Sequence, residues 1–206
     1  MEPMEPIIQA VLDAIPRAGL VEVEVSARHV HLTQEHLEVL FGKGAKLTPK
    51  RPLSQPGQFL SEERVTIVGP KRKMERTAVL GPVRPATQIE LSRSDCVALG
   101  VDAPVRMSGN VKGSAPITIV GPCGSLEVDE GAIIAKEHVH LTPDVAEVMG
   151  VADGQHVDVE VFTARPVVFR DVVIRVSSKS SCRMHIDFDE ANAALVSGFT
   201  LGKIIK

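Results

Sequence analysis

The chain has 206 residues, of which 44% are hydrophobic and 24% charged, so it can bury a sizeable core as one large domain or two small ones. Its net charge of −3 and its 3% aromatic content, without Trp or Tyr, disfavour a nucleic-acid surface built from stacking rings over a basic groove. Three cysteines without a C-x-x-C pair, no long apolar run and no secretory signal predict a cytoplasmic protein without disulfides or membrane spans.

Residues 1–20 stand apart as an N-terminal tail. Pro and Gly residues bracket a short segment with an apolar stripe on one helical face, made of Ile7, Ile8, Val11, Leu12 and Ile15. The stripe predicts a short amphipathic helix. Such a helix docks on its own domain or serves as a handle for another protein.

The chain then repeats itself. The segment that begins at Ser26 with SARHVHLT is echoed by AKEHVHLT from Ala135, 109 residues later. In each copy a Thr, Thr33 or Thr142, precedes a predicted helix that ends at Gly42 or Gly150. We therefore expect each His-x-His to lie in a strand that leads into a helix.

A basic stretch follows the first repeat motif. Residues 43–84 contain ten basic residues and three glutamates, a net charge of +7 within an acidic chain. Such a stretch either holds a polyanionic ligand or is a solvated basic face.

A second, weaker echo aligns the segment around Glu90 with the segment around His185, each before a capped helix. The second of these helices should run through Val196, before Gly198. Elsewhere the pattern has a period of two and is divided by Gly-Pro pairs, which predicts many short strands. We predict a mainly β fold with two small β-barrel domains related by internal duplication and a pseudo-twofold. Their bounds are 21–135 and 136–206.

Five of the seven histidines fall in this duplicated pattern. Alternate strand residues project from the same face, so each His-x-His pair is a bidentate metal clip. Adding Glu90 to one pair and His185 to the other gives two three-ligand sets: His29, His31 and Glu90, and His138, His140 and His185. Three protein ligands with an open fourth position are typical of catalytic zinc. His36 and His156 have no such partner and are expected on the surface.

Two arginines lie close to these sets in sequence. Arg84 precedes Glu90 by six residues in a loop stiffened by Pro82 and Pro85, and its guanidinium fits a phosphate or a surface carboxylate. Arg28 should point away from the ligands and be structural. No Ser or Cys lies in a nucleophile-elbow motif, and Cys182 is expected to be a packed thiol.

The motifs, in their order, resemble the PduL-type phosphotransacylases over about residues 21–200. They are Ser26–Leu32, Gln55–Phe59, Val79–Glu90, Glu137–Pro143 and Met184–Ala193. The resemblance implies two β-barrel domains with a dinuclear zinc centre between them. It also implies reversible transfer of a short acyl group, propanoyl or acetyl, between coenzyme A (CoA) and inorganic phosphate, with acyl phosphate as the other product.

Carried over by residue, the resemblance implies that His29, His31, Glu90, His138, His140 and His185 bind two zinc ions and that Arg84 contacts phosphate. It further implies a bacterial microcompartment, with residues 6–15 as an encapsulation helix that binds a shell protein, and we expect a homo-oligomer. Two other hypotheses stay open: a binuclear zinc hydrolase, and a non-catalytic, shell-associated metal-binding module.

Overall fold

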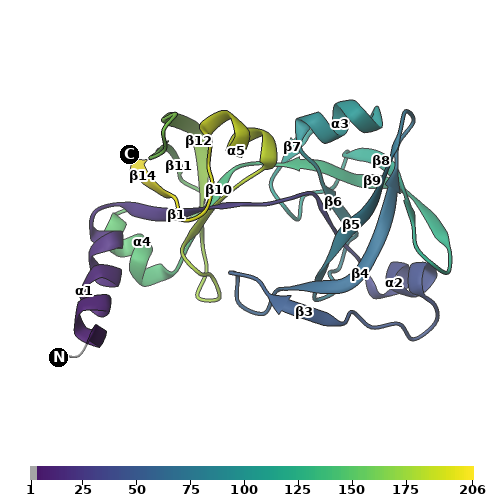
Figure 1. The fold of residues 1–206 in the computed structure, drawn as a ribbon, viewed down its shortest axis with the longest axis horizontal. Coiled ribbons are helices and arrows are strands. Elements are labelled where there is room, and N and C mark those ends of the chain that lie inside the picture. The colour runs from purple at the N-terminus through teal and green to yellow at the C-terminus, as the bar shows by residue number, and fades with distance from the viewer. Residues whose placement is uncertain (1–3) are drawn as a thin grey trace. The chain divides into compact units, whose positions relative to one another are not determined.

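The computed structural model describes residues 4–206, apart from the side chains of residues 5–9, 12 and 13 (Figure 1). Within these residues the chain forms fourteen strands and five helices. The helices are α1 (Met4–Arg17), α2 (Gln34–Phe41), α3 (Arg93–Leu99), α4 (Pro143–Met149) and α5 (Phe188–Ala194). The prediction of a mainly β fold with short helices is confirmed. No helix in the described range is long and apolar enough to span a membrane.

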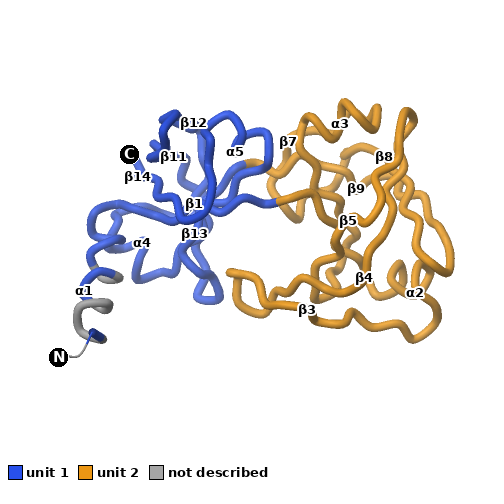
Figure 2. The backbone as a smooth tube through the Cα atoms, in the orientation of Figure 1, with its two compact units in different colours: residues 1–26, 137–206 blue, residues 27–136 orange. Residues whose placement is uncertain are grey.

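The chain divides into two compact units (Figure 2). Unit 2 is continuous, from Ala27 to Lys136, and unit 1 combines Met1–Ser26 with Glu137–Lys206. The predicted boundary between residues 135 and 136 lies one residue before the observed one, and residues 21–26 of the predicted first half lie in unit 1. Those residues belong to β1 and pack with the C-terminal segment.

Unit 2 contains a closed ring of six strands in the order β4, β5, β2, β6, β9, β8, with β8 pairing back to β4. Short strands β3 and β7 add to β4 and β9. The bounds are β2 (His29–His31), β3 (Pro49–Pro52), β4 (Phe59–Val68), β5 (Lys73–Gly81), β6 (Gln88–Glu90), β7 (Val105–Arg106), β8 (Ala115–Val120) and β9 (Ser125–Ala135).

Unit 1 contains a second closed six-stranded barrel, in the order β1, β13, β10, β12, β11, β14. Its strands are β1 (Leu20–Val25), β10 (His138–Leu141), β11 (His156–Val161), β12 (Val167–Val176), β13 (Arg183–Ile186) and β14 (Leu201–Ile205). The two barrels predicted from the sequence are therefore confirmed.

The two barrels share one pairing scheme. In both, the His-x-His strand runs antiparallel to the strand of the third ligand and parallel to the strand on its other side. By this scheme β1 in unit 1 corresponds to β9 in unit 2, because each pairs in parallel with the third-ligand strand. Each repeat thus begins with a strand, β1 or β9, that completes the barrel formed by the other repeat. This exchange explains why residues 21–26 belong to unit 1 and not to the first half of the chain.

Each barrel is filled by the alternate apolar residues of its strands. In unit 2, Val30 and Ile89 are fully buried in one cluster. In unit 1, Val139 and Met184 occupy the equivalent places in the other cluster. Because successive strand residues point to opposite faces, their histidine and glutamate neighbours project away from the core.

Local signals set the helix ends. Thr33 caps α2 by accepting a hydrogen bond from the amide of His36, and α2 ends at Gly42 as predicted. Helix α4 begins at Pro143 as predicted, but Thr142 forms no side-chain cap. Helix α5 ends at Ala194, before the predicted Val196, because Leu195 adopts a left-handed conformation with φ of 51°.

The Gly-Pro pairs at 69 and 121 have a packing role. A Cβ at Gly69 would lie 2.4 Å from the carbonyl oxygen of Leu99, and one at Gly121 would lie 2.4 Å from that of Leu40. These oxygens belong to the last residue of α3 and to the last turn of α2. Only glycine lets the β-turns approach the helix ends so closely.

The N-terminal helix α1 lies against β1 and α4 in unit 1. It extends through Pro16 to Arg17, beyond the 6–15 segment taken from the sequence. Of the predicted apolar stripe, Val11 is exposed and Ile15 is half-buried. The side chains of Ile7, Ile8 and Leu12 lie outside the described residues.

Candidate metal sites

The first ligand set lies on adjacent strands of unit 2. Strands β2 and β6 pair so that His29 is opposite Glu90. With Val30 and Ile89 in the core, His29, His31 and Glu90 all project from the other face. Their three donor atoms lie within 4.8 Å of one another. The structure therefore brings the three predicted residues together as one group.

The distances in this set suit one tetrahedral ion. His29 Nε2 lies 3.1 Å from His31 Nε2 and 3.5 Å from Glu90 Oε2. Two ligands of a tetrahedral zinc ion with bonds of about 2.0–2.1 Å are roughly 3.3 Å apart. The carbonyl oxygen of Ala27 lies 2.8 Å from His29 Nδ1, so Nδ1 can donate to it and leave the lone pair on Nε2 for a metal.

The pKa shifts in unit 2 favour the metal-binding forms of Glu90 and His31, whereas His29 would have to lose a proton to bind a metal. Burial opposes a charged imidazole at His29, but the Glu90 carboxylate outweighs it and raises the pKa of His29. Against burial, the charge of His29 and its hydrogen bond hold the pKa of Glu90 well below its usual range. Burial, then the charges of His29 and Arg84, lower the pKa of His31 far below its usual value. A carboxylate and a neutral imidazole, the forms that bind zinc, are thus present at neutral pH.

Two residues that sequence reasoning missed hold Glu90 in place. Gln88 Nε2 and the Ser108 hydroxyl donate to Glu90 Oε1 over 2.6 and 2.8 Å. Arg84 donates to the same Ser108 hydroxyl over 3.3 Å, so Ser108 links the predicted phosphate contact to a predicted ligand. Gln88 lies two residues before Glu90 on β6, and that spacing could have identified it. Ser108 lies in a loop and has no local signal.

The second set occupies the equivalent place in unit 1. Strands β10 and β13 pair so that His138 is opposite His185, just as His29 is opposite Glu90 in unit 2. His138 Nε2 and His140 Nε2 are 3.1 Å apart, and the donor atoms of all three histidines lie within 4.8 Å of one another. Burial, with the charges of His138 and His185, lowers the pKa of His140 to about 3, so His140 is neutral at physiological pH.

Glu24 on β1 also reaches this set and was not predicted. The pairing of β1 with β13 places Glu24 opposite His185, and its Oε2 lies 3.3 Å from His185 Nε2. His185 Nε2 is buried and forms no hydrogen bond, so Glu24 lies near it without accepting from it. A metal ion would satisfy this nitrogen.

The remaining predicted residues have structural surroundings. Arg28 forms a 2.9 Å ion pair with Asp95 and belongs to neither ligand set, in line with a structural role. His156 is exposed and pairs with Asp171. His36 is half-buried, not a surface residue, because its Nδ1 lies 2.7 Å from the Thr87 hydroxyl oxygen. Cys182 packs at the edge of the unit 1 core.

In unit 1, the two positions that correspond to Arg28 and Asp95 are both occupied by glutamates. Arg28 precedes His29, and Asp95 is the third residue of α3. In unit 1, Glu137 precedes His138 and Glu190 is the third residue of α5. Burial, then the nearby charges of Asp187 and Glu137, raises the pKa of Glu190 to about 8. A protonated Glu190 is thus favoured by folding.

Replacing Glu190 with glutamine should stabilise the protein at alkaline pH. The folded-state pKa of about 8 exceeds the ordinary 4.5, so the stability of the wild-type protein falls as pH rises from about 4.5 to about 8. Glutamine stays neutral and can still accept the Asp187 amide that Glu190 Oε2 accepts at 2.7 Å. At pH 8.5 we expect Glu190→Gln to melt roughly 3 to 8 °C above wild type. At pH 5 the two proteins should melt at about the same temperature, and calorimetry measures both values. Equal shifts at both pH values, or a shift in the exposed control Glu147→Gln, would contradict this.

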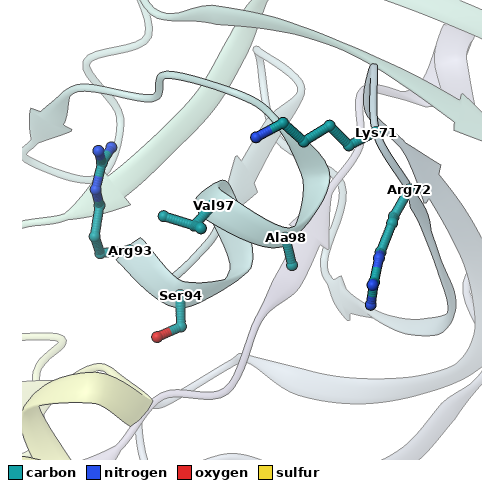
Figure 3. Close-up of a pocket in the computed structure, with 6 residues that line it drawn as sticks. All are labelled: Lys71, Arg72, Arg93, Ser94, Val97 and Ala98. Carbon is teal, nitrogen blue, oxygen red and sulfur yellow. The ribbon is translucent and has the colours of Figure 1, made fainter.

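A basic pocket of about 490 Å³ lies elsewhere on unit 2. Figure 3 shows Lys71 and Arg72 beside α3, which contributes Arg93, Ser94, Val97 and Ala98. Arg93 pairs with Asp102 at 3.2 Å. None of the lining residues belongs to either ligand set. The pocket therefore accounts for part of the basic stretch 43–84 without extending the metal site.

Comparison with known proteins shows which family the chain resembles over most of its length. A family model described as phosphate propanoyltransferase matches residues 22–197. A phosphate propanoyltransferase of Lachnoclostridium phytofermentans is 54% identical over 186 residues, which cover 90% of this chain and 85% of that protein. One from Clostridioides difficile is 46% identical, with 97% of this chain and 96% of that protein covered. One from Thermotoga maritima is 50% identical, with 89% and 88% covered.

Proposed function

The chain belongs to the phosphate propanoyltransferase family and is therefore an acyltransferase, and we propose that it exchanges a propanoyl or acetyl group between CoA and inorganic phosphate. We also propose that the chain holds two zinc ions, one at each ligand set. The observation that carries this proposal is the pair of three-donor sets in equivalent places of two barrels, within a chain that matches the family over residues 22–197.

The residues present fit zinc. Each set offers borderline imidazole nitrogens, with one carboxylate in unit 2, and supplies three of the four ligands of a tetrahedral zinc ion. The buried His185 Nε2 has no hydrogen-bond partner, and a bound metal ion would satisfy it. The chemistry that zinc supplies when bound is Lewis acidity, which polarises the thioester carbonyl and stabilises the departing thiolate.

The residues of the chain supply binding and orientation. The guanidinium of Arg84 holds phosphate and offsets negative charge as the phosphate oxygen attacks the thioester carbon. In that step a C–O bond forms, the C–S bond breaks, and the products are acyl phosphate and CoA. Ser108 bridges Arg84 and Glu90, so it fixes the phosphate contact relative to the ligand set. Direct attack is proposed because no Ser or Cys lies in a nucleophile-elbow motif.

Metal content and activity, measured together, test the proposed function. We expect close to two zinc ions per chain by plasma mass spectrometry, formation of propanoyl phosphate from propanoyl-CoA and phosphate, loss of this activity after chelation, and its return with added zinc. Full activity with one ion or fewer contradicts the two-zinc proposal. Ester hydrolysis without acyl transfer favours the hydrolase alternative, and bound metal without turnover favours the non-catalytic module.

That the two ions form one dinuclear centre, as the resemblance implies, stays a prediction. Cobalt substitution tests it, because two cobalt ions that share a bridging ligand show magnetic coupling in electron paramagnetic resonance. Uncoupled spectra at full occupancy would contradict a shared centre.

We further propose that residues 1–19 direct the enzyme to a microcompartment shell and are not needed for catalysis. Every predicted ligand and Arg84 lie after residue 25, and Val11 on α1 is 55% exposed. Deleting residues 1–19 should leave kcat within about twofold while changing assembly size, measured by light scattering, or co-localisation with shell proteins. Light scattering also tests the predicted homo-oligomer. Loss of activity or solubility would mean that α1 is needed for folding, because it packs on β1 and α4.

A further inference from the structure

Four adjacent strands of unit 1 display a row of charged residues on the face that carries the histidines. Val139, Ile174 and Met184 fill the barrel core, so His140, Arg175 and Arg183 project from the opposite face. Register places Glu22 opposite Arg183, Arg183 opposite His140, and His140 opposite Arg175. His140 therefore lies between two arginines, one on β13 and one on β12.

The two arginines differ in how their charge is balanced. Arg183 is neutralised by a 3.0 Å ion pair with Glu22 at the end of the row. The Arg175 side chain is half-buried, and within the described residues it forms no hydrogen bond or ion pair. The pKa of His140 is lowered mainly by burial, then by the charges of His138 and His185, and then by the charge of Arg175.

The carboxylates of the neighbouring segments are already engaged. Asp153 accepts a hydrogen bond from the amide of Val176, Asp158 pairs with Arg170, and Asp171 pairs with His156. A half-buried guanidinium without a carboxylate partner in the protein favours binding of an anion from solution, here beside a ligand set.

The equivalent position in unit 2 is different. There His29 is opposite Ala78 and Val30 opposite Val79, so the next residue of β5, Leu80, takes the place of Arg175. Unit 2 brings its arginine, Arg84, from the loop before β6 instead. The cation of unit 1 is thus not a consequence of the repeat, and it needs its own explanation.

We propose that Arg175 binds a phosphoryl oxyanion next to the three histidines of unit 1. The planar fork of an arginine matches two phosphoryl oxygens, and a charge-assisted pair of this kind is strong where water is partly excluded. This inference rests on the proposed function, since both inorganic phosphate and CoA carry phosphoryl groups. It names a second contact beside Arg84, on the other barrel.

Binding measurements with each reactant alone test the proposal without turnover. Zinc-loaded wild type, Arg175→Gln and Arg175→Lys are titrated by calorimetry with inorganic phosphate and, separately, with CoA. The control is Arg170→Gln, an exposed arginine on the same strand. Zinc content and melting temperature are measured for each variant.

We expect Arg175→Gln to bind one probe roughly 10- to 100-fold more weakly, with two zinc ions and an unchanged melting temperature, and Arg175→Lys to lose less. A loss confined to phosphate assigns Arg175 to inorganic or acyl phosphate, and a loss confined to CoA assigns it to the CoA phosphates. Unchanged affinity for both probes overturns the proposal, as does an equal loss in Arg170→Gln. Loss of zinc or of stability in both Arg175 variants also overturns it, because Arg175 would then support His140. Arginine-dependent binding in a protein without acyl transfer would reject the proposed function alone.

Discussion

Replacing His140 with alanine should lower the rate of acyl transfer by at least about 100-fold and reduce the zinc content from two ions per chain to about one. The expected loss is large because even residues that only support metal ligands cost 10- to 100-fold when removed. His140 is neutral at physiological pH, and its Nε2 lies 3.1 Å from that of His138, as ligands of one ion require. Plasma mass spectrometry and steady-state kinetics measure the two effects.

The matched control is His156→Ala, an exposed histidine on β11 that belongs to neither set. It should keep both zinc ions and nearly full activity. His36 is a poorer control than its sequence suggests, because its contact with Thr87 ties α2 to the start of β6. Equal losses in His140→Ala and His156→Ala would show that the histidines are assigned wrongly.

Replacing Arg84 with alanine should lower kcat/KM for phosphate by about 100-fold or more while the melting temperature stays unchanged. Removing one group that stabilises developing charge typically costs about 10²- to 10³-fold in kcat. Arg84 is half-buried, and its hydrogen bond to the Ser108 hydroxyl is long, at 3.3 Å, so we expect little loss of stability when that bond is removed. Steady-state kinetics with phosphate varied, and calorimetry, measure the two quantities.

Two further variants separate a phosphate contact from general electrostatics. Arg84→Lys should recover part of the activity, because it keeps the charge but lacks the planar fork. Arg72→Ala removes a cation of the same basic stretch, at the pocket in Figure 3, and should leave kcat/KM for phosphate unchanged. A lower melting temperature in Arg84→Ala with an unchanged KM for phosphate would make Arg84 structural.

The ligand sets were accessible from the sequence because their geometry is local. A His-x-His in a strand presents both rings on one face whatever the rest of the fold does. A second, weaker repeat then aligned Glu90 with His185 as the third ligand of each set. The structure places these residues opposite His29 and His138 on the neighbouring strands. Helix ends were equally local, since Thr33 and Gly42 act on the backbone of their own helix.

The partner of β1 was not accessible in this way. Strands β1 and β9 have the same place in their repeats, and nothing in either strand states which barrel it completes. The exchange is decided by pairing across the whole chain, in which Glu24 meets His185 and Val25 meets Ile186. This is why a domain boundary drawn from the repeat alone separates β1 from its barrel.

The sequence by itself thus determined the six candidate ligands, the two-barrel fold and the family, because each depends on short motifs and their order. Only the tertiary structure placed Ser108 between Arg84 and Glu90, and Arg175 beside His140 without a carboxylate. Such contacts join residues on strands and loops far apart in the chain, and they depend on register between strands. A shift of one residue along β12 would turn Arg175 into the core, so its role follows from the pairing and not from the motif that contains it.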